Sequence, residues 1–277
     1  MFAALNRKRQ KIRYLAYLSG SCARADPKVR WTLVRPRTFW IVIFAVAVFS
    51  LFDPMLIRSN AATDRPMAEI NYSSRDHLIG DLLNAKQGGD NWILVANYWS
   101  GAAAPKTRRF KAKLIWSDTA FYALFEAQQA EELIVSSRPD LTKKTMNLWD
   151  RDVVEIFLAP DLSAPRRYFE FEVAPTGEWL DVAIDLTSGE RIADWDYRSG
   201  METAARIEDG RVRMAMKIPW EAFGRKPKTG DVWRGNILRC VGKGPERGYL
   251  AWQPTRTETP NFHVPDKFGE FKFVGQR

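Results

Sequence analysis

Two short stretches of this 277-residue chain carry carboxylates among apolar residues at the spacing of a β-strand. In residues 153–158, three alternate apolar residues would face a core, and Glu155 lies on the opposite face. In residues 168–173 the alternation is strict, and Glu170 and Glu172 lie opposite two phenylalanines and a valine. If the two strands pair, the three carboxylates share one face of a sheet.

Carboxylates grouped in this way suit several kinds of site. They can form the acid–base pair of a glycosidase, bind a cation, or accept hydrogen bonds from sugar hydroxyls, and the alternative is a solvated strand face. The chain shows no second domain of catalytic size, so we expect no catalytic residue and no enzymatic activity. We also expect no cofactor, although structural calcium is compatible with such carboxylates. The sequence leaves the metal ligands unknown.

The motifs of common nucleotide, zinc and serine-hydrolase sites are absent from the sequence. Its two histidines, His77 and His263, are far apart in sequence, and each is expected to be a structural or surface residue. The two cysteines have no zinc spacing and imply no disulfide framework. Cys240 alternates with apolar neighbours, as a core residue would.

Aromatic residues accompany these carboxylates. The chain has 11 tryptophans, so some are expected at a binding surface. Trp149 comes just before the first carboxylate strand, and Trp252 ends a later strand at a loop. Between them, Asn236 and Arg239 add polar groups to an aromatic strand, where a regular alternation places them on opposite faces.

Short strands are the elements that must position these residues. Turn residues separate candidate strands over 92–97, 109–116, 120–126, 153–158, 168–173, 178–184, 203–208, 211–218, 232–241, 248–252 and 270–274. A short helix over 76–85 and one helical turn over 219–224 are also expected. This spacing predicts an all-β fold, an antiparallel β-sandwich of immunoglobulin-like or jelly-roll type.

The net charge of +9 belongs to the N-terminal arm. Residues 1–37 contain ten Lys or Arg residues and one Asp, and the rest of the chain contains 32 basic and 32 acidic residues. A neutral domain has no broad electrostatic footprint for nucleic acid. We therefore expect no nucleic-acid partner.

An uncharged apolar run follows this arm over residues 39–52. Fourteen helical residues would span about 21 Å, against about 30 Å for a hydrocarbon core. Because Arg35 and Arg37 directly precede the run, the positive-inside rule keeps the N-terminus in the cytoplasm and exports the C-terminal domain. The run predicts an N-terminal hydrophobic helix, either an uncleaved signal anchor or a cleaved signal peptide.

These observations divide the chain into four parts. We expect a basic cytoplasmic arm over 1–37, the hydrophobic segment over 38–57, a linker and irregular segment over 58–90, and a β-sandwich over 91–277. The sandwich would be membrane-anchored or secreted, in the periplasm or outside the cell. Cys22 and Cys240 would then lie on opposite sides of the membrane and could not pair.

An ordered series of motifs extends over roughly residues 92–275. It comprises W-x-x-D-x-V-E-I-F at 149–157, Y-F-E-F-E-V-A-P-x-G at 168–177, I-P-W-x-x-F at 218–223, W-R-x-N-x-x-R at 233–239, then A-W-x-P-T and F-H-x-P-x-x-F-G-x-F. In order and spacing the series resembles the family 9 carbohydrate-binding modules and their DOMON-like relatives. The resemblance implies a DOMON-like sandwich that binds a sugar, with a glycan chain end as one form of that ligand.

In sugar-binding members of this family, two tryptophans clamp a terminal sugar ring and polar side chains hold its hydroxyls. On the matching positions, the resemblance implies Trp149 and Trp252 as the clamp and Glu155 as a hydroxyl-binding carboxylate. Asn236 and Arg239 join this set from their local polarity, and the two glutamates of the second strand are possible further carboxylates. Flat rings over the apolar face of a sugar and polar groups at its rim fit this assignment.

Two alternatives stay open at this point. Some DOMON-like sandwiches bind haem, and Met214, Met216 and His263 are the residues here that could be axial ligands. The second alternative comes from residues 71–101, which lack the D-G-x-x-D-x-x-W opening that is common in the family. It could therefore be a structural or partner-binding sandwich that has lost its sugar site.

Overall fold

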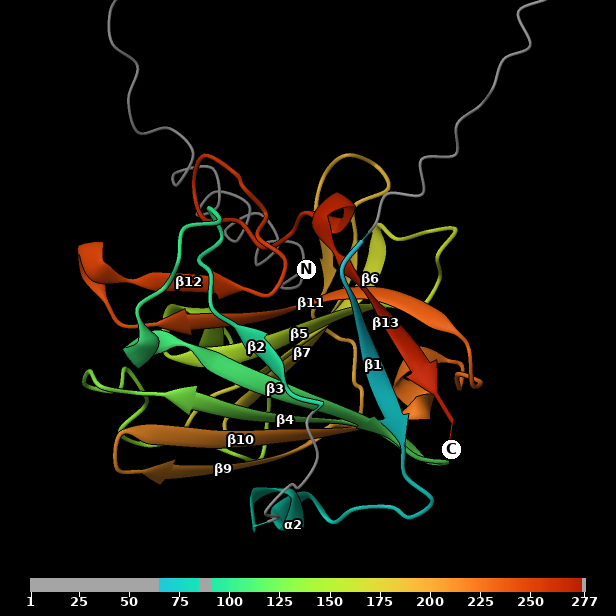
Figure 1. Ribbon diagram of the computed structural model, residues 1–277, viewed down its shortest axis with the longest axis horizontal. Helices are drawn as coiled ribbons and strands as arrows, with labels where there is room; N and C mark the ends of the chain where they lie inside the picture. The colour runs from blue at the N-terminus through green and yellow to red at the C-terminus, as the bar shows by residue number, and fades with distance from the viewer. Residues whose placement is uncertain (1–64, 85–90, 276–277) are drawn as a thin grey trace, which may run out of the picture. The chain divides into compact units, whose positions relative to one another are not determined.

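Residues 65–84 and 91–275, which the computed structural model describes, form one continuous mixed sheet of 13 strands (Figure 1). The strand order is β8-β7-β6-β5-β11-β13-β1-β3-β4-β10-β9, and β12 and β2 pair with β11 and β3. The strands are β1 (Met67–Tyr72), β2 (Ile93–Val95), β3 (Phe110–Trp116), β4 (Ala120–Gln128), β5 (Val153–Ala159), β6 (Arg167–Val173), β7 (Trp179–Asp185), β8 (Ile192–Asp194), β9 (Glu202–Glu208), β10 (Arg211–Pro219), β11 (Val232–Val241), β12 (Gly248–Ala251) and β13 (Gly269–Val274).

The helical elements of the described residues are short. They are α2 (Ile79–Asn84) and the 3₁₀ turns η1 (Lys106–Arg108), η2 (Leu148–Asp150), η3 (Trp220–Phe223), η4 (Gly244–Glu246) and η5 (Pro265–Lys267). The expected short helix over 76–85 and helical turn over 219–224 are both present as α2 and η3. The fold is therefore built of strands, and most of the candidate site residues lie on them.

The sheet curls, so that its two halves enclose a shared apolar core. Strands β5 and β6 contribute Ile156 and Phe171 to this core, and strands β4 and β10 contribute Phe125 and Met216. All four side chains are fully buried. Burying each such side chain contributes about 1.5–3 kcal/mol, so this core is the main source of cohesion between the halves.

A second apolar cluster, called the outer cluster below, covers the other face of β5, β6, β7 and β11. It contains Phe157, Tyr168, Val182 and Leu238, which alternate with the residues of the shared core. Leu148, in the turn η2, also belongs to this cluster. These strands are thus buried on both faces, and the solvated strand face that the sequence left open for the glutamates is not what the structure shows.

Strand β1 lies within the segment expected to be linker, residues 58–90. It pairs in parallel with both β13 and β3, and so joins the two halves of the sheet. Ala68 and Ile70 face inward while the residues beside them do not. Two buried residues in a six-residue strand are a weak periodic signal, and for this reason the sequence did not reveal the strand.

The predicted all-β domain is confirmed, and its predicted strands are found in the structure within about two residues of their expected ends. The sequence missed β1 and the three-residue edge strand β8. Two separate antiparallel sheets are not seen, because β1 makes parallel pairs and connects all strands into one sheet.

The basic arm over 1–37, the apolar segment over 38–57 and Cys22 lie outside the described residues. Among the residues that are described, none belongs to a helix long and apolar enough to cross a membrane.

Candidate functional site

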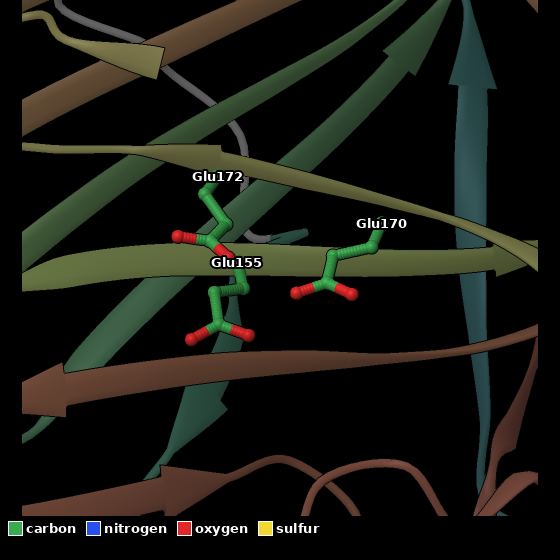
Figure 2. Close-up of side chains that lie close together, drawn as sticks. All are labelled: Glu155, Glu170 and Glu172. Carbon is green, nitrogen blue, oxygen red and sulfur yellow. The ribbon is translucent and has the colours of Figure 1, made fainter. Parts of the chain in front are cut away.

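Strands β5 and β6 pair in a register that brings the three glutamates together. Glu155 is directly opposite Glu172, and Glu170 is opposite Phe157, so all three side chains lie on the same face (Figure 2). One carboxylate oxygen from each residue lies within 4.8 Å of the others. The exposed fractions of Glu155, Glu170 and Glu172 are 2%, 5% and 0%. The predicted shared face is confirmed, and it is a buried one.

The electrostatic setting of this cluster disfavours three free negative charges. Burial raises the pKa of Glu155 to about 8, and the charge of Glu170 adds to that rise. Burial also raises the pKa of Glu170 to about 7 and that of Glu172 well above its ordinary value. A buried charge without a partner is very costly. The three groups therefore need shared protons or a bound cation to coexist at neutral pH.

The thiol of Cys240 lies beside the cluster, on the facing strand β11. Its Sγ donates a hydrogen bond to Oε1 of Glu155 over 3.4 Å. Cys240 is a buried free cysteine within the outer apolar cluster, as its sequence neighbours indicated. Burial raises the pKa of its thiol well above the ordinary value, so it acts here as a neutral donor.

Trp149 lies on the same side of the sheet, in the turn η2 that leads into β5. Its ring packs against Trp195 with a centroid distance of 5.9 Å and an angle of 33°. Arg247 holds the turn in place by donating to the backbone carbonyl groups of Trp149 and Arg151. Both tryptophans are partly exposed at the edge of the outer cluster. The result is a fixed aromatic pair at the carboxylate-bearing face.

Trp252 takes a different place. Its ring stacks on Phe271 at 5.2 Å and 13°, against the shared core between the two halves of the sheet. A Cβ atom at Gly269 would lie 2.5 Å from the indole, so this glycine is required for the close fit. Trp149 and Trp252 thus belong to different apolar clusters, and each ring packs against a different aromatic partner. The sugar-binding role of each stays a prediction.

Asn236 and Arg239 lie on opposite faces of β11, as their spacing indicated. The side chain of Asn236 is fully buried and brackets the loop after β12: Nδ2 donates to the Gln253 carbonyl at 2.8 Å, and Oδ1 accepts the Gln253 N–H at 2.9 Å. Its polar groups therefore serve the loop beside the carboxylate face.

Arg239 points into the other side of the sheet, away from the glutamates. Its Nη1 donates to the carbonyl groups of Arg108 and Gln128 at 2.7 Å each, and Nη2 donates to the Gln129 side chain. Burial lowers its pKa to about 10. All of these partners are internal, so Arg239 acts as a structural link between β11 and the end of β4.

Two residues that the sequence analysis did not select keep the site in shape. Asp152, buried at the start of β5, accepts the Gly242 N–H at 2.7 Å and the Ile134 N–H at 3.3 Å. Lys144 forms a buried ion pair with Asp181 at 2.6 Å. The aspartate was visible in the W-x-x-D motif, but its partners are remote in sequence and leave no local signal.

Lys144 also supports the aromatic pair. Its Nζ donates to the Trp195 carbonyl at 3.3 Å and to the Tyr197 carbonyl at 2.7 Å. Asp181 in turn accepts the N–H and the hydroxyl of Ser199, both at 2.7 Å. One buried ion pair therefore fixes the segment that carries Trp195.

Of the three residues considered for haem ligation, the two methionines lie in one cluster and the histidine lies at another. Met214 and Met216 are buried in the shared core on β10. His263 lies at the outer cluster, where its ring stacks on Phe157 at 5.3 Å and its Nδ1 is 2.7 Å from the hydroxyl of Tyr168. The structure does not assemble these residues into an axial ligand pair.

A surface hollow of about 460 Å³ lies where β6 begins and β7 ends. Phe169, Ile184 and Phe223 form its apolar lining, and Arg167 and Asp185 lie at its edge. None of the predicted sugar-binding residues or further carboxylates lines this hollow.

The comparison with protein families gives a match over most of the chain. The model of the family described as "Carbohydrate family 9 binding domain-like" matches residues 83–276. Two curated relatives, endo-1,4-beta-xylanase A of Thermotoga neapolitana and of Thermotoga maritima, are each 21% identical over 170 residues. That match covers 61% of this chain but only 14% of each xylanase, so the likeness is confined to a small part of those enzymes.

Solved structures share the fold at low sequence identity. A candidate carbohydrate-binding protein from Bacteroides uniformis is 18% identical with a TM-score of 0.56, over 76% of this chain and 99% of that one. A family 9 carbohydrate-binding module from Caldicellulosiruptor kristjanssonii is 18% identical, with TM-scores of 0.52 in complex with cellotriose and 0.53 in complex with glucose. These matches cover 76% of this chain and 95% and 97% of the module.

Proposed function

Since the chain belongs to the carbohydrate family 9 binding domain-like family, we propose that its β domain is a non-catalytic module that binds a sugar. The observation that carries the proposal is the fixed pair of Trp149 and Trp195 at the carboxylate-bearing face. Indole rings cover the apolar face of a pyranose, and neighbouring polar groups bond its hydroxyls. The curled sheet would then be the DOMON-like sandwich of this family.

Glucose and short β-linked glucans are the first ligands to test. The Caldicellulosiruptor kristjanssonii module was solved with glucose and with cellotriose. In this chain Glu155 is the candidate hydroxyl acceptor. It lies on the sheet face that carries the cluster of Trp149 and Trp195, and only 2% of its surface is exposed. Sugar contact with Glu155 would therefore require the surrounding loops to open.

We expect the domain to be non-catalytic because its clustered carboxylates are buried. Glycosidase carboxyl groups flank the scissile bond and leave room for substrate between them. Here Glu155, Glu170 and Glu172 are buried, and their oxygens approach one another within 4.8 Å. Their burial keeps these carboxylates from contact with a glycosidic bond, so we expect no turnover of aryl glycosides.

We also propose that the domain works outside the cytoplasm, attached through residues 38–57 or released after cleavage. The support is the uncharged run at 39–52 behind a strongly basic arm. Fractionation of a C-terminally tagged chain tests this placement, and a soluble cytoplasmic product would contradict it.

The decisive experiment is calorimetric titration of the full-length chain with glucose, cellobiose and cellotriose. Trp149→Ala and Trp195→Ala are each expected to weaken binding about five- to thirtyfold, since each removes about 1–2 kcal/mol of ring stacking. Trp92→Ala is the matched control, because Trp92 is a partly buried tryptophan on the unrelated cluster beside α2.

Trp252→Ala separates two forms of the site. Loss of binding in Trp149→Ala and Trp252→Ala, but not in Trp195→Ala, would support the clamp implied by the family resemblance. Loss in Trp149→Ala and Trp195→Ala, with Trp252→Ala unchanged, would support the pair seen here. No binding by the unaltered chain to any of these sugars, or to a broad glycan array, would contradict the proposed function.

A further inference from the structure

Glu172 is the most unusual carboxylate in the described part of the chain. It is fully buried, and among the described residues its only hydrogen-bonding neighbour is another carboxyl group, that of Glu170. Its side chain extends from β6 into the space beside Glu155 and Glu170 (Figure 2). Burying a polar group without a partner is unfavourable, and burying a charged one is more so. A shared proton or a bound cation is needed to satisfy Glu172.

Two other buried carboxylates of the domain, Asp181 and Glu178, have a cationic partner. Lys144 lies 2.6 Å from Asp181, and Arg151 lies 3.1 Å from Glu178. No ion pair of this kind joins a described Lys or Arg to any glutamate of the cluster. Arg247 influences Glu155 only through its positive charge, which lowers the pKa of that carboxyl group. The cluster thus groups three buried carboxylates without the cationic partner that Asp181 and Glu178 each have.

The spacing of the oxygens fits a single cation of calcium size. Calcium binds oxygens at about 2.3–2.6 Å, so two ligands on opposite sides are up to about 5 Å apart. One oxygen from each glutamate falls within 4.8 Å of the others. Magnesium binds at about 2.0–2.1 Å, requires near-octahedral geometry and keeps several waters, which a buried cluster accommodates poorly.

We propose that Glu155, Glu170 and Glu172 together bind one divalent cation of the calcium class between strands β5 and β6. The three carboxylates supply hard oxygen ligands, and the cation would neutralise them and link the two strands. The proposal does not rest on sugar binding, because the cation alone is its ligand.

The test is calorimetric and thermal titration of the chelator-treated, full-length chain with CaCl₂. We expect one equivalent to bind, and the thermal midpoint to rise by about 5 °C or more at a hundredfold excess over Kd. Glu172→Gln keeps the size of the side chain and removes its charge, and it is expected to weaken calcium binding at least about tenfold. Glu69→Gln, at an exposed strand position, is the matched control and is expected to bind like the unaltered chain.

Two results would overturn the proposal. One is no calcium binding by the unaltered chain, which would mean that shared protons neutralise the cluster. The other is equal binding by Glu172→Gln and Glu69→Gln, which would place the cation elsewhere. If Glu172→Gln does not fold, Mn²⁺-soaked crystals of the unaltered chain decide. An anomalous peak at the three carboxylates supports the site, and a peak elsewhere or none at all contradicts it. Sugar titrations with and without calcium report on the proposed function separately.

Discussion

At the scale of single residues, buried polar groups in this domain are held by partners that are distant in sequence. Arg239 donates to carbonyl groups at Arg108 and Gln128, and Asp152 accepts the N–H groups of Gly242 and Ile134. Each link joins two segments that must be positioned to form one face. These residues therefore define the shape of the site without lining it.

His263 makes the pH dependence of stability testable at this scale. Burial lowers its pKa well below the usual value, and the charge of Arg191 adds to that effect. The folded protein thus keeps His263 neutral, while the unfolded chain takes up a proton near pH 6.5. The contribution of neutral His263 to the free energy of unfolding is present above pH 6.5. It is lost as the pH falls below 6.5, by up to about 1.4 kcal/mol per pH unit.

The measurement is urea unfolding of the unaltered chain and His263→Gln at pH 7.5 and 5.5. The unaltered chain is expected to lose more free energy of unfolding on acidification than His263→Gln does. Titration of the glutamates and of His77 occurs in both proteins and cancels in this difference. Parallel losses in the two proteins would contradict a neutral His263 in the folded state.

At the scale of elements, one ion pair decides where the segment after β8 lies. Lys144 binds Asp181 on β7 and the carbonyl groups of Trp195 and Tyr197. Lys144→Met would leave the carboxylate of Asp181 buried without its cation. Breaking a buried pair in this way costs about 3–5 kcal/mol, and we expect that loss in urea unfolding at pH 7.

The neighbouring residue supplies the control. Lys143 pairs with Asp140 at 3.1 Å, but the two side chains are 76% and 42% exposed. A surface pair contributes about 0–1 kcal/mol, so Lys143→Met is expected to have little effect. If Trp195 contributes to sugar binding as proposed, Lys144→Met should also weaken that binding, and Lys143→Met should not. Equal stability of the two variants would show that Lys144 does not anchor the loop.

At the scale of the whole described domain, β1 joins the two halves of the sheet. It lies between β13 and β3, and Ile70 is fully buried in the shared core. Removing it would open two sheet edges and leave a cavity between the halves. We expect a chain beginning at residue 61 to fold and a chain beginning at residue 75 to aggregate or to lose its near-ultraviolet circular dichroism. A native spectrum from the shorter chain would show that β1 is dispensable.

Much of the strand pattern of this domain was accessible from local periodicity. Alternation in 153–158 and 168–173 correctly placed Glu155, Glu170 and Glu172 on one side, because side-chain direction in a strand repeats every two residues. The ordered motifs likewise indicated the family that the chain matches over 83–276. Both signals lie within short segments, and neither depends on how the segments meet.

The features that the sequence did not predict depend on pairing between strands that are remote in the chain. Strand β1 joins the sheet through parallel pairing with β13, near the end of the chain, and with β3, and the ring of Trp252 stacks on Phe271. The pairing of β5 with β6 buries Glu172 with only the carboxyl of Glu170 as a hydrogen-bonding neighbour among the described residues, while Arg239 has three hydrogen-bond partners. Periodicity specifies which way a side chain points, but the atoms it meets depend on which remote strand packs against it, and that is set by the global arrangement of the sheet.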